Sequence, residues 1–473
     1  AYMLKKKKGF CNFSRTGTGK TKSAIISSRI TKSKRTLVLC PKAIDEQWKT
    51  MITDDYPEST VSVGNKVIFP PVISEKDYRY HVINYEKFSY DESADKIIEA
   101  VNAEPVDLVI VDEAQNIKQR IEHTKPDEEF TFQDQKDMSA RKRNVEKMVN
   151  LLRAKNPKCK MLVLTATPVI NNVTEGAKLL ELVAGNKFDN LNYENTVRNA
   201  SRLYTEFKEY SIRYNKKYNI KENKGGEYDI KVSTTIPSER SNEEIRKMHY
   251  STFEQMCTVD RIPEMIKIAK NRGGKIIIYT DYVTGIVEPI KEAFELETNP
   301  ATGRKFRVGL YTGSNKSGLK TPTAEKNVYF NPFKNGDLDI LVASTPIAEG
   351  VDGLQHVCNT IIFNGLTWTF AKYEQIVGRL VRTGQRSKEV NIYRMLSSIE
   401  GYEYDQKIKV DRLHRKQLLQ ECVLDGRTPD LGAWDKQTAK EKREMLESVI
   451  LNRQSRVRTK NQIRKDIRAG KTA

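Results

Sequence analysis

An octapeptide near the start of the chain, "SRTGTGKT" from Ser14 to Thr21, has the residue types that hold phosphate groups. It departs from the full P-loop spacing only at its first position, where Ser14 replaces glycine. Glycines there turn backbone N–H groups toward phosphate oxygens, Lys20 can reach the β- and γ-phosphates, and Thr21 can offer a hydroxyl to Mg²⁺. The predicted phosphate-binding residues are Gly17, Thr18, Gly19, Lys20 and Thr21. The alternative is a flexible Gly/Thr loop followed by a surface lysine.

A second stretch, "LVIVDEAQ" from Leu108 to Gln115, is an apolar run that ends in two carboxylates. If the run is a strand, its end delivers Asp112 to a Mg²⁺ that also touches Thr21, and it places Glu113 to polarise a water molecule that attacks the γ-phosphate. An Asp-Glu pair after a buried strand is common by chance. A pair in this order after a phosphate loop is much rarer, so the two stretches describe one reaction.

Two further stretches follow apolar runs: "LTATPVINN" from Leu164 to Asn172 and "EQIVGRLVRTGQ" from Glu374 to Gln385. In the second, Arg379 and Arg382 are three positions apart, so on a helix they would share one face and reach one anionic target. The alternative for this stretch alone is a helix with two solvated arginines.

The elements that must position these residues are visible as short β-branched runs between longer polar helical stretches. The runs are "RTLVLCP", "RYHVINY", "VDLVIVDEA", "KMLVLTATP", "KIIIYTD", "VGLYTG", "LDILVAST", "NTIIFNG" and "VNIYRML". Each run is apolar and ends in a polar or small residue, which is typical of buried parallel strands whose carboxyl ends carry a site. Two successive sets of runs predict two α/β lobes.

The predicted organisation follows from where these runs stop. It is a first lobe over residues 1–205 with an insertion at 118–144, a linker over 206–250, a second lobe over 251–424 and a basic helical extension over 425–473. The insertion is polar and sign-mixed, and the linker region is charged and lacks strand periodicity.

The composition of the chain indicates which class of protein it belongs to and which kind of partner it binds. The chain has 473 residues, of which 38% are hydrophobic and 30% charged, and we find no membrane-spanning run and no signal peptide. We therefore expect a soluble, intracellular protein, in the cytoplasm of a bacterial or infected cell or in a nucleus. Six scattered cysteines form no CxxC pair, which argues against zinc, iron–sulfur and disulfide roles. The formal charge of +19 favours a polyanionic partner, although a solvated basic surface is the alternative.

The ordered set of motifs resembles that of superfamily-two helicases and translocases. It comprises "SRTGTGKT", "VLCPKAIDEQW", "VINYE", "VDEAQNIK", "LTATPVINN", "KIIIYTDY", "LYTGSN", "LVASTPIAEGVDGLQ" and "QIVGRLVRTGQ", and extends from about Gly9 to Arg394. The Trp after the second motif, the Asn-rich end of "LTATPVINN" and the Gly-Arg-x-x-Arg-x-Gly-Gln ending are most similar to the Swi/Snf-like branch. The segment "STPIAEGVDGLQ" is nearer to general helicases of the superfamily, so strand separation stays open.

The resemblance implies an α/β fold of two tandem RecA-like lobes, parallel sheets flanked by helices, with ATP and Mg²⁺ in a cleft. Asp112 and Thr21 would hold Mg²⁺, and Glu113 would be the base. Arg379 and Arg382 would act as arginine fingers from the second lobe. Gln115 would couple hydrolysis to lobe closure together with Thr165, Ala166 and Thr167. Fingers on a separate lobe make hydrolysis sensitive to closure.

The family's nucleic-acid contacts fall at strand ends. By resemblance they are Pro41, Lys42, Asn84, Tyr85, Thr280, Asp281, Thr312, Gly313, Ser344 and Thr345. Most of them are small or polar groups suited to phosphates, which implies tracking along a strand without reading its sequence. The alternative for each is a residue that only caps a strand or helix.

These observations predict an ATP-dependent DNA motor, either a double-strand translocase or a compact helicase that remodels branched DNA, acting as a monomer or as a subunit of a larger assembly. A second hypothesis is a nucleic-acid-stimulated ATPase subunit of a viral, phage or chromatin assembly. A third is an RNA helicase, which Trp48 and the Gly-Gln ending disfavour because they resemble the DNA-translocating branch.

Overall fold

The computed structural model divides the chain into two compact units, and each is described by itself. It describes residues 1–64, 69, 74, 76–117, 140–188, 191, 196–214, 224–236, 242–313, 323–348, 351–427 and 446–447. Unit 1 comprises Ala1–Lys217 and Lys416–Leu431, and unit 2 comprises Tyr218–Arg415 and Gly432–Ala473. No helix within these described ranges is long and apolar enough to cross a membrane.

Unit 1 is built on a parallel sheet whose described part has seven strands in the order β3-β4-β2-β5-β6-β1-β7. The strands are β1 (Gly9–Asn12), β2 (Arg35–Cys40), β3 (Thr60–Val63), β4 (Arg79–Asn84), β5 (Leu108–Asp112), β6 (Lys160–Leu164) and β7 (Ser211–Ile212). The helices are α1 (Tyr2–Lys6), α2 (Lys20–Ile30), α3 (Asp45–Asp55), α4 (Asp91–Ala103), α6 (Ala140–Lys155), α7 (Val173–Ala184) and α8 (Val197–Tyr210). Short 3₁₀ turns are η1 (Lys42–Ile44), η2 (Tyr85–Ser89) and η3 (Ala114–Asn116).

Alternation along the apolar runs gives unit 1 two cores, one on each face of its sheet. In β2, Leu37 and Leu39 pack with α4, α6, α7 and α8, whereas Val38 and Cys40 pack with α1, α2 and α3. These strands are buried on both faces, and this explains why their sequences read as continuous apolar runs.

Unit 2 repeats this plan with a parallel sheet whose described strands follow the order β12-β13-β9-β14-β15-β8. The strands are β8 (Lys224–Thr234), β9 (Ile276–Tyr279), β12 (Val308–Tyr311), β13 (Ile340–Ala343), β14 (Thr360–Phe363) and β15 (Val390–Ile399), with a separate antiparallel pair of β10 (Thr298–Asn299) and β11 (Arg304–Lys305). The helices are α10 (Asn242–Lys247), α11 (Tyr250–Arg272), α12 (Val287–Leu296), α13 (Thr323–Asn335), α14 (Phe370–Val377) and α15 (Asp411–Asp425). Shorter turns are η4 (Thr345–Ala348), η5 (Leu354–His356) and the π-helical η6 (Gln406–Val410).

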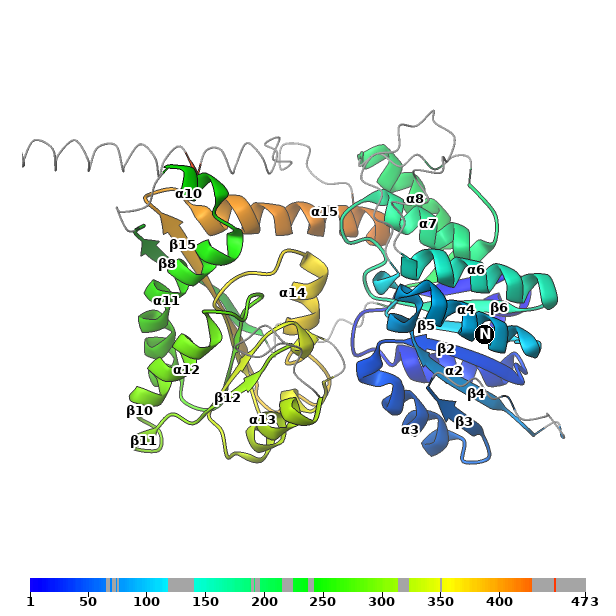
Figure 1. Ribbon diagram of the computed structural model, residues 1–473, viewed down its shortest axis with the longest axis horizontal. Helices are drawn as coiled ribbons and strands as arrows, with labels where there is room; N and C mark the ends of the chain where they lie inside the picture. The colour runs from blue at the N-terminus through cyan, green and yellow to red at the C-terminus, as the bar shows by residue number, and fades with distance from the viewer. Residues whose placement is uncertain are drawn as a thin grey trace, which may run out of the picture. The chain divides into compact units, whose positions relative to one another are not determined.

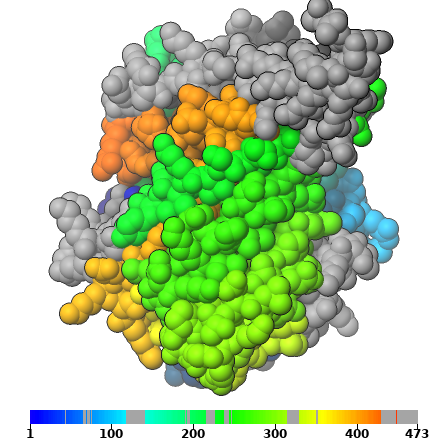
Figure 2. All heavy atoms as spheres, turned by 90° about the vertical axis from the view of Figure 1, so that its left-hand side faces the viewer, coloured from blue at the N-terminus to red at the C-terminus, as the bar shows by residue number. Residues whose placement is uncertain are grey.

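Helices cover both faces of the unit 2 sheet. Residues of α11 and α12 pack on one face, and residues of α13 and α14 pack on the other. Figure 1 shows the two sets within unit 2, and Figure 2 shows the green segment that contains α11 and α12 at the surface of this unit. The predicted α/β fold of two tandem RecA-like lobes is confirmed.

The chain between the predicted lobes differs from the linker expected at 206–250. The helix α8 continues to Tyr210, and β8 adds an edge strand to the sheet of unit 2 along the whole of β15. Its sequence, "KGGEYDIKVST", is charged because most of the strand is exposed, which hides its strand character.

The C-terminal part also departs from the expected organisation, because α15 passes from unit 2 into unit 1 at Lys416. Leu419, Cys422, Val423 and Leu424 at its end are buried in a core of unit 1. Of the extension expected over 425–473, only 425–427 and 446–447 lie within the described residues, and Leu446 is buried in a cluster of unit 2. Of the insertion expected at 118–144, residues 118–139 lie outside them, and 140–144 begin α6.

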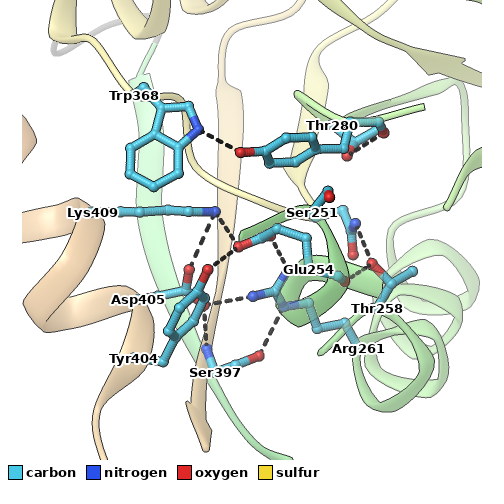
Figure 3. A network of polar contacts seen from close by, with 12 residues as sticks. Ser251, Glu254, Thr258, Arg261, Thr280, Trp368, Ser397, Tyr404, Asp405 and Lys409 are labelled. Carbon is cyan, nitrogen blue, oxygen red and sulfur yellow. Dashed lines mark hydrogen bonds and ion pairs between the residues drawn. The ribbon is translucent and has the colours of Figure 1, made fainter. Parts of the chain in front are cut away.

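A ring of four buried charges fixes α11 in unit 2 (Figure 3). Arg261 Nη1 lies 3.1 Å from Glu254 Oε2, and its Nη2 lies 2.6 Å from Asp405 Oδ2. Lys409 Nζ closes the ring, 2.6 Å from Glu254 Oε1 and 3.6 Å from Asp405 Oδ1. Burial opposes ionisation of Glu254, yet Lys409 and Arg261 lower its pKa to about 2. The ring is thus a neutral set of paired charges, and removing one member would leave an uncompensated buried charge.

This ring also sets the path of the chain after β14. A Cβ on Gly365 would lie 2.5 Å from Glu254 Oε2, so only glycine fits beside the ring. Asn364 Nδ2 donates a 2.8 Å hydrogen bond to Thr258 Oγ1 of α11. The segment that leads from β14 into α14 is therefore held against α11.

Candidate functional site

The phosphate loop of unit 1 connects β1 to α2, as its spacing predicts. Gly17 and Gly19 have φ angles of 76° and 78°, which lie in the left-handed region that favours glycine. Gly19 is the N-cap of α2, so the first N–H groups of this helix face the loop. Thr18 Oγ1 donates to the carbonyl of Arg15 over 2.7 Å and tightens the turn.

Within this loop Lys20 is folded back onto the chain. Its side chain is 9% exposed, and Nζ donates to the carbonyl oxygens of Ser14 at 3.0 Å and Arg15 at 3.3 Å. The Lys20 ammonium hydrogens that bond these two carbonyls could bond a phosphate group instead. Thr21, the next residue of α2, is half-buried beside it.

Serine at the first loop position has a role that the sequence did not reveal. The Ser14 side-chain oxygen accepts a hydrogen bond from the N–H of Tyr214 over 3.0 Å, and its own N–H donates to Asn12 Oδ1 over 3.1 Å. Ser14 therefore ties the loop to the chain that follows β7.

The two carboxylates after β5 lie in different environments. Asp112 is buried, and its Oδ2 accepts a 2.9 Å hydrogen bond from Trp48 Nε1 while its Oδ1 accepts one from the N–H of Glu113. Burial and the neighbouring Glu113 charge raise the pKa of Asp112 to about 7, against the opposing influence of Lys20 and Trp48. A buried carboxylate that is short of positive charge fits a cation, and oxygen donors suit Mg²⁺.

Glu113 occupies a special backbone conformation, with a φ angle of 49° in the left-handed region. This conformation is uncommon for a residue with a side chain and often marks a functional position. Tyr85 OH donates to the Glu113 carbonyl over 3.3 Å and accepts from Asn116 Nδ2 over 2.7 Å. The turn after β5 is thus held from two sides.

A hydrogen-bonded path connects the turn after β5 with the turn after β6. Gln115 Nε2 donates to Glu113 Oε2 over 2.7 Å, and Gln115 Oε1 accepts from Thr165 Oγ1 over 2.6 Å. Thr165 Oγ1 in turn accepts from the N–H of Thr167 over 3.0 Å. The amide of Gln115 therefore contacts both stretches that the sequence analysis assigned to hydrolysis and to coupling.

The remainder of "LTATPVINN" is ordered by side-chain hydrogen bonds at the start of α7, where Asn172 is the N-cap. Asn172 Oδ1 accepts from the N–H of Glu175, and Glu175 Oε2 accepts from the N–H groups of Ile170 and Asn171. Lys416 of α15 donates to Asn171 Oδ1 over 2.7 Å. The end of this motif is thereby attached to the part of α15 that belongs to unit 1.

The predicted nucleic-acid residues of unit 1 lie at the carboxyl ends of β2 and β4, which are adjacent parallel strands. Lys42 is exposed, and its Nζ lies 2.6 Å from Asp45 Oδ2, while Pro41 is buried. Asn84 and Tyr85 are 5% and 1% exposed, respectively. Tyr85 thus supports the turn at Glu113, a role that is not visible in its sequence context.

In unit 2, Arg379 and Arg382 lie beyond the end of the helix on which they were expected. The helix α14 ends at Val377, and the N–H groups of Arg379 and Leu380 bond the carbonyls three residues back, those of Ile376 and Val377. The expectation of one shared helical face is therefore wrong, because the chain after Val377 forms irregular turns, in which the N–H of Val381 bonds the Val377 carbonyl and that of Arg382 bonds the Leu380 carbonyl.

Both arginines instead contact the motif that precedes β14. Arg379 donates to the carbonyl of Val351 over 2.9 Å and to that of Ala348. Arg382 Nη1 lies 3.0 Å from Asp352 Oδ1, and although burial opposes ionisation of Asp352, Arg382 helps to lower its pKa. The neighbouring Glu349 and Gly350 of "STPIAEGVDGLQ" lie outside the described residues.

The predicted nucleic-acid residues of unit 2 lie together at the carboxyl edge of its sheet. Thr280 and Asp281 follow β9, Thr312 and Gly313 follow β12, and Ser344 and Thr345 follow β13. These three strands are neighbours in the order β12-β13-β9. The Gly313 N–H donates to Ser344 Oγ over 3.1 Å, which links the ends of two strands.

Aromatic residues contact the chain that follows β9, and Trp368 and Thr280 are labelled in Figure 3. Trp368 Nε1 donates to Tyr282 OH over 3.1 Å, and Thr280 Oγ1 donates to the carbonyl of Tyr282 over 3.1 Å. Lys409 of the buried ring lies 5.7 Å from the centre of the Trp368 ring. Strand-end residues on β9 are therefore attached to the buried ring.

Comparisons with known proteins agree with this arrangement. Residues 2–170 match the family model of the type III restriction enzyme res subunit, and residues 257–384 match that of the helicase conserved C-terminal domain. An uncharacterized ATP-dependent helicase, YqhH, from Bacillus subtilis (strain 168) is 25% identical over 162 residues, 34% of this chain. The chain spans about a quarter of that relative, 26% of its length. The two family matches lie in unit 1 and unit 2, respectively, and the relative adds a similarity to an ATP-dependent helicase.

Proposed function

We propose that this chain is a superfamily-two helicase that acts as an ATP-dependent DNA motor, either a duplex translocase or a compact helicase related to the Swi/Snf-like branch. The observation that carries the proposal is the path from Glu113 through Gln115 to Thr165. It joins the proposed base of the hydrolysis reaction to the turn after β6 at the same sheet edge. A change at the γ-phosphate can therefore alter the position of that turn.

The residues around the phosphate loop have distinct roles in this proposal. Lys20 leaves the carbonyls of Ser14 and Arg15 to neutralise the β- and γ-phosphates, and the N-terminus of α2 supplies N–H donors. Thr21 and Asp112 would hold Mg²⁺, which neutralises charge on the phosphate oxygens when bound. Glu113 accepts the proton of the attacking water, and Gln115 holds the Glu113 carboxylate in position.

Arginine fingers from unit 2 are part of the same proposal. Arg382 is paired with Asp352, and Arg379 is bonded to backbone carbonyls, so each guanidinium is held by its own unit. A finger acts on the charge that develops at the γ-phosphate, which would make hydrolysis depend on the arrangement of the two lobes.

DNA is proposed as the polyanion for two reasons. The formal charge of +19 favours a polyanion, and the residues at the strand ends of unit 2 are small and polar, as suits contacts to phosphates without base reading. Trp48 and the Gly-Gln ending of the last motif favour DNA over RNA by their likeness to the DNA-translocating branch.

The test is ATP turnover by the purified chain and by its Lys20→Ala variant, each with no nucleic acid, duplex DNA and duplex RNA. We expect turnover that duplex DNA stimulates more than RNA and that Lys20→Ala abolishes, because the variant lacks the cation at the β- and γ-phosphates. DNA affinity should fall with a slope of about −0.9 in log–log salt plots for each phosphate neutralised. Equal stimulation by RNA would favour an RNA helicase, and turnover in the variant would refute the site.

A further inference from the structure

A lysine that no motif assigned lies over the carboxyl edge of the unit 2 sheet. Lys372, in the first turn of α14, places its Nζ 2.8 Å from Asp281 Oδ1 and 2.8 Å from Thr345 Oγ1. Asp281 and Thr345 follow β9 and β13, which pair directly in the sheet. The ammonium group therefore bridges two adjacent strand ends that carry predicted nucleic-acid contacts.

The position of Lys372 is not explained by helix stability. The Thr369 side chain caps α14 by accepting from the N–H of Lys372, which places this lysine at the positive end of the helix dipole. A cation there is disfavoured, and the charge of Asp281 offsets this effect. The pair thus concentrates one positive and one negative charge where the helix itself favours an anion.

Some hydrogen-bonding capacity of the Lys372–Asp281 ion pair is unused among the described residues. Asp281 is 8% exposed in its side chain, and its Oδ2 is buried with no hydrogen-bond partner among the described residues. The Lys372 side chain is 25% exposed, so it is open to solvent on one side. Its ammonium has three donors, of which Asp281 and Thr345 take two.

Small residues lie at the neighbouring strand ends of the same sheet edge. Gly313 and Ser344 lie at neighbouring strand ends and bond to each other through the Ser344 hydroxyl. Among the described residues, a Cβ on Gly313 would meet nothing closer than 3.5 Å. The partial exposure of the Lys372 side chain leaves its ammonium accessible to an anion such as a phosphate group.

We propose that Lys372 binds a backbone phosphate of the nucleic acid and that Asp281 is its counter-ion, which holds the ammonium in place and competes with that phosphate. The inference rests on the proposed function, since it assigns a residue to the nucleic-acid contact of the same edge. Asp281 thereby weakens binding instead of supporting it, which departs from the contact role that the sequence analysis expected.

This arrangement predicts effects of opposite sign from the two partners. Lys372→Met removes the cation, so DNA affinity should fall about tenfold, the usual scale for a hydrogen bond to a charged group, and the salt slope should shrink by about 1. Asp281→Asn keeps an oxygen for Lys372, removes the competing charge and turns the unpartnered oxygen into an amide donor. DNA affinity should therefore rise several-fold.

The experiment measures binding of the full chain to a labelled DNA duplex of mixed sequence over a series of salt concentrations. Lys267→Met is the matched control, because Lys267 is an exposed lysine of α11 that pairs with Glu264 over 3.5 Å. It should retain the affinity and slope of the unmodified chain. Lys372→Arg should retain most of the slope, since it restores the charge.

Each outcome supports or overturns the assignment. If Lys372→Met and Asp281→Asn weaken binding alike, the pair only maintains the fold and the inference is wrong. If Lys372→Met behaves like Lys267→Met, Lys372 contacts no phosphate, although the proposed function stands. If the unmodified chain fails to bind DNA at low salt, the proposed function fails first, and this inference falls with it.

Discussion

The indole N–H of Trp48 donates a 2.9 Å hydrogen bond to Asp112 Oδ2, and this bond joins α3 to the end of β5. Trp48 is 1% exposed, so its ring also fills the core between α3 and the sheet. The tryptophan therefore has two separable roles, one in packing and one in orienting a carboxylate proposed to hold Mg²⁺.

Replacing Trp48 with phenylalanine separates these roles. Trp48→Phe keeps a ring in the core and removes the N–H donor that helps to keep the Asp112 pKa down. We expect ATP turnover to fall about tenfold to a hundredfold, the usual range for partners of metal ligands. Tyr80→Phe is the matched control, since Tyr80 loses a buried hydrogen bond to Ser28 in the same core. Equal loss in both variants would show that only packing matters.

Neutralising Glu113 should separate nucleotide binding from hydrolysis. Glu113→Gln keeps the size of the side chain and leaves Lys20 and Asp112 in place, so ATP affinity should stay near that of the unmodified chain while turnover stalls. Equilibrium ATP binding and single-turnover hydrolysis measure the two effects. Glu104→Gln is the control, since Glu104 is an exposed glutamate that pairs with Arg35 away from the phosphate loop. Loss of ATP affinity as large as in Lys20→Ala would contradict the role of a base.

The finger hypothesis predicts a kinetic effect without a binding effect. Arg382→Ala should lower kcat by roughly 10³-fold and leave ATP affinity within about tenfold, because a finger stabilises the transition state. DNA binding should persist. Arg394→Ala is the matched control, since Arg394 also forms an ion pair, with Asp229 on the edge strand. Unchanged DNA-stimulated turnover would refute the finger role, and a collapse of DNA affinity with intact basal turnover would move Arg382 to the nucleic-acid contacts.

A buried histidine makes the stability of unit 1 depend on pH. His81 on β4 is 0% exposed, its Nε2 lies 3.0 Å from the Gly64 carbonyl, and burial lowers its pKa to about 4. In the unfolded chain His81 binds a proton near pH 6.5. The stabilising contribution of neutral His81 is therefore fully present above that pH, and it is lost as the pH falls toward 4. Between pH 7.5 and 5 the free energy of unfolding should drop by about 2 kcal/mol from this residue.

Urea unfolding of the unmodified chain and of His81→Gln at both pH values measures this contribution. Glutamine can still hydrogen-bond but does not titrate in this range, so the variant should lose less stability on acidification. An equal drop in both proteins would assign the pH dependence to other groups.

The sequence by itself determined the buried strands of the two sheets and the polar or small residues at their carboxyl ends. Runs such as "RTLVLC" are apolar on both faces because helices cover both sides of the sheet. Burial on both faces requires apolar residues, so these strands can be recognised from the sequence. The loop "SRTGTGKT" was equally visible, because positive φ angles at Gly17 and Gly19 require glycine. Local chemistry of this kind needs no information from distant parts of the chain.

Tertiary structure decided the contacts between residues far apart and the exact ends of elements. Trp48 and Asp112 are 64 positions apart, and Lys372 and Asp281 are 91 apart, so only the folded sheet brings them together. The edge strand β8 reads as a linker because an exposed strand needs few apolar residues, and its pairing with β15 comes from the partner strand. Arg379 and Arg382 leave the helix because tertiary bonds to the Val351 carbonyl and to Asp352 outweigh the weak preference of their sequence for a helix.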